Sequence, residues 1–352
     1  MKHFSSTGRH HTHCESFLRA IRAAFAAALC IVFSASPAAM RLETQSGGES
    51  IKATSVAVNV YAIAEGRHGE LMQGLNKDDF ELTDEGTPQK IAYFSSETNA
   101  GVSLGIAIDT SLSQSHLLNT EREAAKRFLR FVLQGGDQAF VVSFDVDVKL
   151  LKDFTGVATD LVSAIDSAEI NETGRSVLDE NAAKPTGGTH LYDAVYLASN
   201  ELMKTRHGRK VLVLLTDGED QGSKSNLQKS IDAAEKSDVI VYPILVSDPE
   251  FYAMMGTSYR GSASIRKLAR ETGGCTIQVK SVEQIGEAFE KIAGELRSQY
   301  LLVYSPLNLR HDGSFRRIHV KVRGHSYLVR TRTGYYDRSD ETAQTISGTP
   351  SR

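Results

Sequence analysis

The sequence predicts an α/β protein: a doubly wound, mostly parallel sheet flanked by helices, together with a small β-rich unit. Between residues 102 and 296, strand-like apolar runs alternate with amphipathic helical stretches, an order typical of doubly wound sheets. Two of the runs, 102–108 and 211–215, are apolar enough to be buried on both faces. Both end abruptly in side chains that carry oxygen, so we expect candidate ligand groups at one edge of the sheet.

The composition is that of an ordinary soluble globular protein. The chain has 352 residues, of which 41% are hydrophobic and 24% charged, and its net charge is −3. This length holds one sizeable domain and a smaller one, and the charge gives no sign of nucleic-acid binding. Two of the three cysteines lie in the leader, so Cys275 is expected to be a buried small residue outside any disulfide.

Residues 1–38 have the order of a secretory signal peptide. Four basic residues precede an apolar stretch from Ala23 to Phe33, and a run of small residues follows. We expect cleavage between Ser36 and Met40 and export to a periplasm, the cell surface or the medium. The apolar stretch is short for a membrane span. No stable span is therefore expected after cleavage, although an uncleaved anchor stays open.

Residues 39–97 form an N-terminal β-rich segment. After a polar stretch, apolar residues alternate from Val56 to Ala62, which predicts a strand. Two more strands, 78–83 and 89–94, are expected to form a hairpin through Asp84-Glu85-Gly86. The segment has too few apolar positions to be stable by itself.

The central segment, residues 98–298, carries the alternating pattern. The elements expected after the first buried strand are helix 117–132, strands 138–144 and 148–154, helices 161–168 and 191–205, strand 211–215, helix 227–236, strand 239–246, helix 264–271, strand 275–279 and helix 282–296. Asp145 and Asp147 stand between two of these strands. We expect a solvated hairpin tip there rather than an additional cation site.

Residues 299–338 return to a β pattern and form the C-terminal β-rich segment. Both flanking segments lack apolar surface, so we expect them to fold together as one unit. Residues 339–352 are expected to be a disordered tail. The charges of this segment are expected on the wet face of an antiparallel sheet rather than in a polyanion-binding patch; the basic residues are Arg316, Arg317, Lys321, Arg323, Arg330 and Arg332.

The first polar strand end has the spacing of a cation-binding turn. If the strand gives way to a turn at this point, the side chains of Asp109, Ser111 and Ser113 converge. One carboxylate and two hydroxyls make half of an octahedral oxygen shell, the kind that Mg²⁺ prefers. A second carboxylate, Asp217, follows the other buried run. The alternative, in which the two serines cap a helix, stays open.

A Gly-rich loop, Gly187-Gly188-Thr189, lies between the two strand ends in the sequence. In this order the three pieces resemble a von Willebrand factor A domain with its metal-ion-dependent adhesion site, over about residues 98–298. The resemblance implies that Mg²⁺ or Mn²⁺ is bound by Asp109, Ser111, Ser113, Thr189 and Asp217. With its β-rich flanks, the chain resembles a bacterial secreted branch of that family, and this wider match is looser.

The function implied is non-enzymatic, metal-dependent adhesion or protein-ligand binding. The metal would accept an acidic group from a protein partner that presents a carboxylate. No nucleophile with an adjacent base stands near the motif, so no catalytic residue is expected. Two alternatives stay open: a structural or assembly module whose metal stabilises a loop, and a Mg²⁺-dependent phosphoryl-transfer enzyme. Against the enzyme, Ser111 stands where a haloacid-dehalogenase-like pattern has a second carboxylate.

Overall fold

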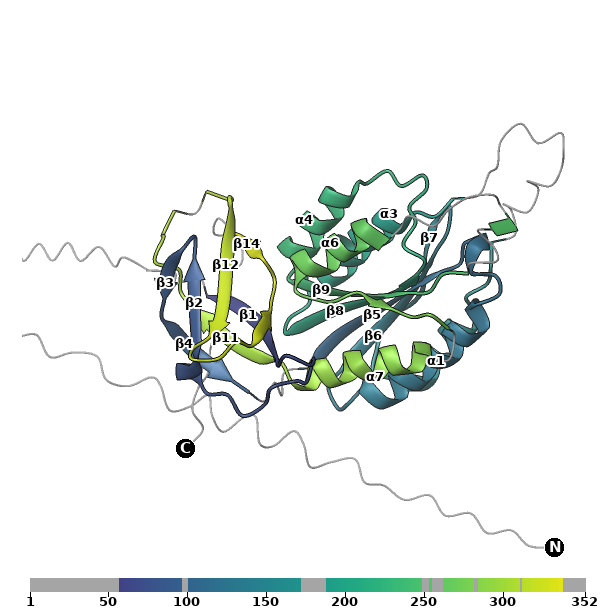
Figure 1. Ribbon diagram of the computed structural model, residues 1–352. Coiled ribbons are helices and arrows are strands. Elements are labelled where there is room, and N and C mark those ends of the chain that lie inside the picture. The colour runs from purple at the N-terminus through teal and green to yellow at the C-terminus, as the bar shows by residue number, and fades with distance from the viewer. Residues whose placement is uncertain are drawn as a thin grey trace, which may run out of the picture. The chain divides into compact units, whose positions relative to one another are not determined.

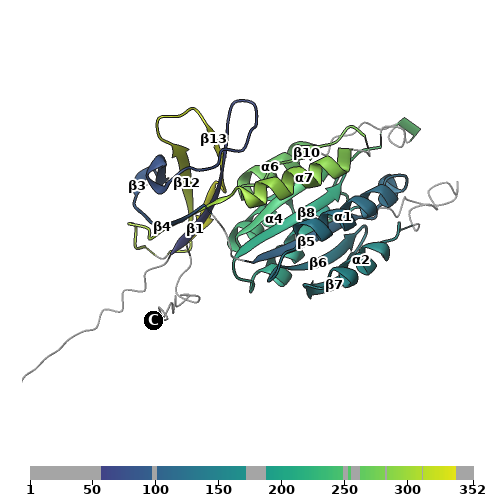
Figure 2. The same ribbon diagram turned by 90° about the horizontal axis from the view of Figure 1, so that it is seen from below.

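The computed structural model describes residues 57–96, 101–171, 188–248, 253–254, 262–281, 284–310 and 312–337. The expected leader, the expected C-terminal tail and Gly187 lie outside these residues. Figures 1 and 2 show a central sheet between two layers of helices, and a separate group of β-strands. Within the described ranges, no helix is both long enough and apolar enough to cross a membrane.

Six strands form the central sheet, in the order β10 (Ile277–Gln278), β9 (Val239–Leu245), β8 (Arg209–Thr216), β5 (Val102–Asp109), β6 (Gln138–Phe144) and β7 (Val148–Thr155). The first five run parallel, and β7 pairs antiparallel with β6. Every residue of β5, β8 and β9 is buried. Burial on both faces explains why these strands have continuous rather than alternating apolar runs.

Helices cover both faces of this sheet. One face packs on α1 (Leu118–Val132), α2 (Ala158–Asp166) and α7 (Gln284–Arg297). The other packs on α3 (Leu191–Leu197) with its π-helical continuation η4 (Ala198–Met203), on α4 (Leu227–Lys236) and on α6 (Ser262–Thr272). The predicted doubly wound, mostly parallel sheet is therefore confirmed. Cys275, expected to be buried, is partly buried against the first of these cores.

The strand register brings the polar strand ends to one edge of the sheet. Ile108 of β5 lies opposite Leu215 of β8, and Asp109 lies opposite Phe144 of β6. Because β5 and β8 are parallel, residues that follow both strands emerge at the same carboxyl edge. The edge predicted to carry ligand groups therefore lies where β5, β6 and β8 end.

The flanking segments form two antiparallel four-stranded sheets over a common core. One has the order β13 (Leu328–Arg330), β1 (Val58–Glu65), β11 (Tyr300–Tyr304) and β4 (Ile91–Ser95). The other has the order β14 (Gly334–Tyr336), β12 (Phe315–Val322), β2 (Phe80–Asp84) and β3 (Thr87–Gln89), with the 3₁₀ helix η1 (Lys77–Asp79) before β2. Each sheet contains strands from both flanks, and their buried residues make one cluster. The predicted β-rich unit from the two flanks is confirmed.

The predicted hairpin is present, but its second strand is wrong. Glu85 (φ 48°) and Gly86 (φ 77°) connect β2 to β3, and positive φ at both turn residues is what a two-residue type I′ hairpin requires. The expected strand 89–94 is two strands: β3 ends at Gln89 in one sheet, and β4 begins at Ile91 in the other. The chain changes sheets at the single residue Lys90.

Six basic residues of the C-terminal β-rich segment were expected on a solvent-exposed face of the sheet, and this prediction is wrong for three of them. Arg330 bonds Glu65 at 2.5 Å and Glu295 of α7 at 2.8 Å, with its side chain 14% exposed. Arg332 pairs with Asp238. Arg316 is buried. The remaining three are exposed as predicted: Arg317, Lys321 and Arg323.

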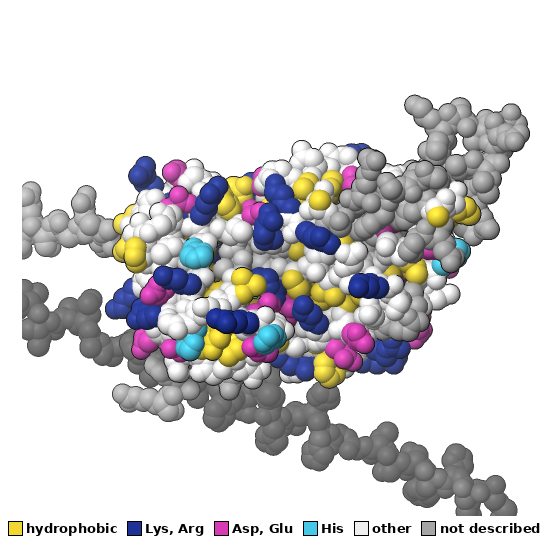
Figure 3. Space-filling model, in the orientation of Figure 1, with side chains coloured by type: hydrophobic (Ala, Val, Ile, Leu, Met, Phe, Trp, Pro, Cys, Tyr) yellow, Lys and Arg dark blue, Asp and Glu magenta, His cyan; other side chains and the backbone are white. Residues whose placement is uncertain are grey.

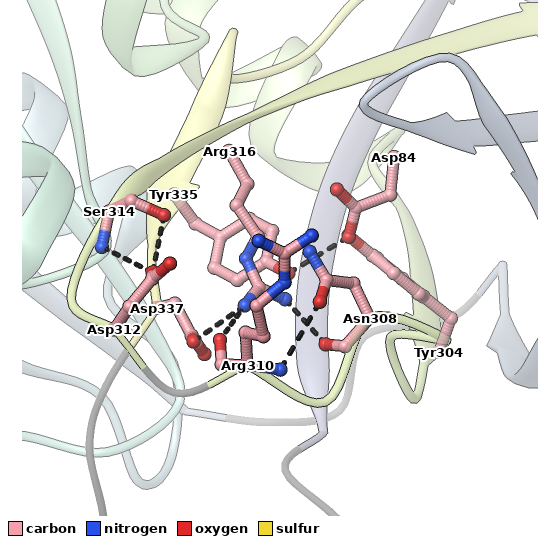
Figure 4. Close-up of polar contacts among 9 residues, drawn as sticks. All are labelled: Asp84, Tyr304, Asn308, Arg310, Asp312, Ser314, Arg316, Tyr335 and Asp337. Atoms are coloured by element: carbon pink, nitrogen blue, oxygen red, sulfur yellow. Dashed lines mark hydrogen bonds and ion pairs between the residues drawn. The ribbon is translucent and has the colours of Figure 1, made fainter.

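Arg316 belongs to a buried polar cluster in the β-rich unit (Figure 4). Its side chain is 2% exposed and forms an ion pair with Asp337 at 2.7 Å, while also donating to two backbone carbonyls of the loop before β12. On the other side of the cluster, Asp84 accepts hydrogen bonds from the hydroxyls of Tyr304 and Tyr335, each at 2.9 Å. The ion pair and the hydrogen bonds compensate for the cost of burying these charges.

Candidate metal centre

Asp109, the last residue of β5, is fully buried at the carboxyl edge of the sheet. Its Oδ1 accepts a hydrogen bond from the backbone N–H of Ser111 at 3.0 Å. Its Oδ2 accepts one from the hydroxyl of Thr216, the last residue of β8, at 2.6 Å. Two neighbouring parallel strands therefore orient both carboxylate oxygens.

The segment after Asp109 makes the turn that the sequence spacing predicts. Ser111 is extended (φ −69°, ψ 161°), and a 3₁₀ helix, η2 (Leu112–Gln114), follows it. The Oγ atoms of Ser111 and Ser113 lie 3.1 Å apart, and Ser113 Oγ donates to Asp217 Oδ2 at 2.6 Å. A continuous series of hydrogen bonds thus joins four of the five predicted ligands: Asp109, Ser111, Ser113 and Asp217.

The loop after β8 holds Asp217 in place. Gly218 has φ 82°, in the left-handed region that favours glycine, and its N–H donates to Thr216 Oγ1 at 3.0 Å. The next N–H, that of Glu219, donates to Asp217 Oδ1 at 3.0 Å. Asp217 is 1% exposed. Its two oxygens are thus held by this turn and by Ser113.

Thr189, the fifth predicted ligand, is attached to the same edge through the backbone. It forms an antiparallel bridge with Gln221, with N–H···O distances of 3.0 and 2.9 Å. Gln221 lies in the loop that follows Asp217. The next residue, His190, donates its N–H to the carbonyl of Asp145, just beyond β6, at 2.6 Å. The structure therefore places the threonine loop between the loops that follow β6 and β8.

Burial and like charge dominate the electrostatics of the site. Burial, and secondarily the neighbouring Asp217 carboxylate, raise the pKa of Asp109 to about 7, although hydrogen bonds from Ser111 and Thr216 act to lower it. A second carboxylate nearby makes the ionised form of Asp109 costly. A bound cation would remove this cost by compensating both charges.

The donor set fits a hard divalent cation. It consists of two carboxylates and three hydroxyls, so it offers only oxygen, as Mg²⁺ and Mn²⁺ prefer. In the described part of the chain, no group of three or more His, Cys, Asp and Glu residues is arranged to hold a metal, which excludes a nitrogen- or sulfur-rich centre from those residues. With few anionic donors, a bound ion retains positive charge for a further acidic ligand.

Asp145 corrects the expectation of a solvated hairpin tip. It is 2% exposed and lies directly behind the metal loop. Its carboxylate accepts from the Thr110 hydroxyl and from the Asn171 side-chain amide, both at 2.9 Å, while its backbone carbonyl binds the threonine loop. Asp147, by contrast, is exposed as expected. Asp145 therefore links the two loops that carry Ser111 and Thr189.

Sequence reasoning also missed Thr216 and Glu121. Thr216 supplies the hydrogen bond to Asp109, and the signal was its place at the last strand position before Asp217. Glu121 is 0% exposed, and burial raises its pKa well above the ordinary value, with further contributions from Asp109 and Asp217. The signal was an acidic residue within the apolar stripe of α1, three residues after Leu118 and seven before Phe128.

Comparison with known families defines the class of domain. The family model of the von Willebrand factor type A domain matches residues 104–219. The chain therefore contains a von Willebrand factor type A domain, as the motifs predicted. No curated protein sequence matches the chain.

Several solved structures are similar to the chain at low sequence identity. Proximal thread matrix protein 1 from the mussel byssus is 16% identical, with a TM-score of 0.46, covering 61% of this chain and 51% of that one. The chain therefore matches about half the length of the mussel protein. Another structure of that protein, 15% identical (TM-score 0.45, 61% and 50% covered), has zinc in its MIDAS motif. The vWF domain of a type V pili tip protein from Porphyromonas gingivalis is 14% identical (TM-score 0.42, 56% and 95% covered).

Proposed function

We propose that this protein is an exported, non-enzymatic binding protein whose von Willebrand factor A domain captures a protein partner through a divalent cation. The residues that would hold Mg²⁺ or Mn²⁺ are Asp109, Ser111, Ser113, Thr189 and Asp217. The ion supplies a positive charge with a coordination position that a carboxylate of the partner can fill. The chain supplies the rigid oxygen set that orients that position.

The observation that carries the proposal is the hydrogen-bonded series from Asp109 through Ser111 and Ser113 to Asp217. It converges at the carboxyl edge of a parallel sheet, where ligands of such folds bind. Figure 3 adds that basic and acidic side chains are interspersed on the face it draws. Mixed charge of this kind favours a protein partner over a nucleic acid.

Two other functions have weaker support. A phosphoryl-transfer enzyme needs a nucleophile with a base within hydrogen-bond reach, and the groups that hydrogen-bond to Asp109 are a backbone N–H of Ser111 and the hydroxyl of Thr216, neither of which is a base. A purely structural metal would stabilise the loops without any effect on a partner. The binding assays below separate both alternatives from capture of a partner.

We further propose a domain organisation for export: signal peptide 1–38, β-rich segment 39–97, A domain 98–298, β-rich segment 299–338 and tail 339–352. The small residues before Met40 support cleavage there. The β-rich flanks support placement in a bacterial secreted branch of the family. N-terminal sequencing of the exported protein tests the leader, and recovery of an intact Met1 in the membrane fraction would indicate an anchor instead.

Calorimetric titration of Mg²⁺ and Mn²⁺ into wild type, Asp109→Ala and Thr189→Ala tests the metal site. Asp109→Ala should abolish binding, because it removes a buried anionic ligand. Thr189→Ala should weaken it less, since water can replace one neutral oxygen. Asp153→Ala, an exposed aspartate on β7, is the matched control and should bind as wild type. Unchanged binding in Asp109→Ala would move the site elsewhere.

Capture of partners tests the function itself. Immobilised wild type and Thr189→Ala are each exposed to native envelope and secreted fractions, in Mg²⁺ and in EDTA. A protein held by wild type only in Mg²⁺, and lost in the variant, supports capture through the ion. Retention in EDTA would favour the structural role. Hydrolysis of a phosphate ester that disappears in Asp109→Ala would favour the enzyme.

A further inference from the structure

Glu121 is a buried carboxylate with no hydrogen-bond partner among the described residues. It lies one turn into α1, on the side that packs against the sheet with Leu118, Ala125 and Phe128. Its side chain is 0% exposed, and neither Oε1 nor Oε2 is hydrogen-bonded. Isolated carboxylates are costly to bury, and buried polar groups are nearly always paired. Its position among apolar neighbours therefore calls for a specific role.

The charged groups that act on Glu121 are those of the candidate metal centre. Burial has the largest effect on its pKa, and the two carboxylates that add to it are Asp109 and Asp217. Because α1 begins directly after the metal loop, its first turns lie close behind the strand ends. A second orphan acceptor comes from the same segment: Gln114 is 0% exposed, its Nε2 donates to the carbonyl of Val246 at 3.4 Å, and its Oε1 has no partner among the described residues.

We infer that Glu121 is a third acidic group of the metal centre, which acts from behind the ligands. It accepts a hydrogen bond from a water molecule that the bound cation retains, and the positive charge of a dication offsets the cost of ionising this buried carboxyl group. This inference rests on the metal site proposed above. We assign Glu121 an indirect role because, among the described residues, no three His, Cys, Asp or Glu side chains are grouped so that they could hold one ion together. Mg²⁺ and Mn²⁺ keep several waters when they bind to proteins. One of these waters can donate a hydrogen bond to the buried carboxylate of Glu121.

The competing explanation is that Glu121 only fills space in the core as a neutral acid. In that case its replacement by an isosteric amide would leave metal binding unchanged. If Glu121 orients a metal-bound water, the same replacement weakens binding, because partners behind the ligands typically contribute roughly 10- to 100-fold to metal affinity. Glutamine preserves the volume, so packing against Leu118 and Phe128 is retained in both cases.

The test compares Glu121→Gln with Glu123→Gln in calorimetric titrations of Mg²⁺ and Mn²⁺. Glu123 is two residues further along α1, 61% exposed and paired with Lys126, so its variant controls for charge loss on this helix. We expect Kd to rise about 10-fold or more in Glu121→Gln and to stay near wild type in Glu123→Gln. Glu121→Asp, which keeps the charge, should lie between wild type and Glu121→Gln.

Two further measurements separate this role from a general structural effect. The unfolding temperature of Glu121→Gln in EDTA should not fall below that of wild type, since no hydrogen bond is lost. Water-proton relaxation of the Mn²⁺ complex, which reports the waters retained by the ion, should differ from that of wild type. Wild-type affinity and relaxation in Glu121→Gln would overturn the inference. Failure of wild type itself to bind either ion would refute the proposed metal site instead, and this inference with it.

Discussion

Replacing Asp109 by asparagine should stabilise the metal-free protein while abolishing its response to Mg²⁺. Burial and Asp217 raise the pKa of Asp109 to about 7 from the ordinary value of 3.8. The folded protein therefore binds a proton more tightly than the unfolded chain does. The contribution of protonated Asp109 to the free energy of unfolding is fully present below pH 4 and is lost as pH rises towards 7. At 1.36 kcal/mol for each pKa unit, the charged form costs about 4 kcal/mol above pH 7.

The amide in Asp109→Asn cannot accept two hydrogen bonds as the carboxylate does, so about 1 to 2 kcal/mol of that gain is lost. We therefore expect the variant in EDTA at pH 8 to unfold with a free energy about 2 kcal/mol higher than wild type. The difference should disappear at pH 4, where both side chains are neutral. Urea denaturation across this pH range measures it.

The same experiment in Mg²⁺ should reverse the order, because only wild type gains stability by binding the ion. Lower stability of Asp109→Asn than wild type at pH 8 in EDTA would refute the argument from buried charge. Equal stabilisation of both proteins by Mg²⁺ would place the metal elsewhere.

Three other predictions concern residues that support the site and the β-rich unit. Asp145→Ala should lower the unfolding free energy by about 2 to 4 kcal/mol, since donors on Thr110 and Asn171 lose their acceptor. It should also weaken Mg²⁺ binding. A Mg²⁺ affinity equal to that of wild type in calorimetric titration would contradict the role of Asp145 as a link between the loops. Arg316→Leu should cost about 3 to 5 kcal/mol by removing one partner of the buried Arg316–Asp337 ion pair, with no change in Mg²⁺ affinity. A urea midpoint equal to that of wild type would contradict this. Deleting residues 299–338 should leave 51–97 protease-sensitive while 98–298 stays folded, and resistance of 51–97 in that truncation would disprove shared folding.

The sequence predicted the central sheet because its signals are local and strong. The buried strands are continuous apolar runs, and each ends in a polar group that has no place in a core. The conformational requirements are also local: Gly218 follows Asp217 in a turn with positive φ, and Ser111 and Ser113 alternate into a 3₁₀ helix. Such features can be identified within a window of about ten residues.

The residues that were missed depend on contacts distant in sequence. Asp145 follows a strand, as a hairpin tip would, and is buried by Asn171 and by the loop of His190. The burial of Glu121 and Arg316, however, could have been predicted from the periodicity of the apolar residues around them. Glu121 occupies an inward position of a 3.6-residue repeat, and Arg316 shares its face of β12 with Ile318, two residues on. A charged residue in phase with apolar neighbours indicates a buried partner or a site, rather than a solvated face.

The pairing of β4 with β11 has a consequence for how this chain is assembled. Ser95 lies opposite Leu301, so the chain leaves the β-rich unit and returns to it on adjacent antiparallel strands. The A domain is thus an insertion whose ends meet about one strand spacing, roughly 5 Å, apart. A turn of about two to five residues would connect β4 to β11 as a plain hairpin. We therefore expect the β-rich unit to keep the β4–β11 register when the inserted domain is removed or replaced.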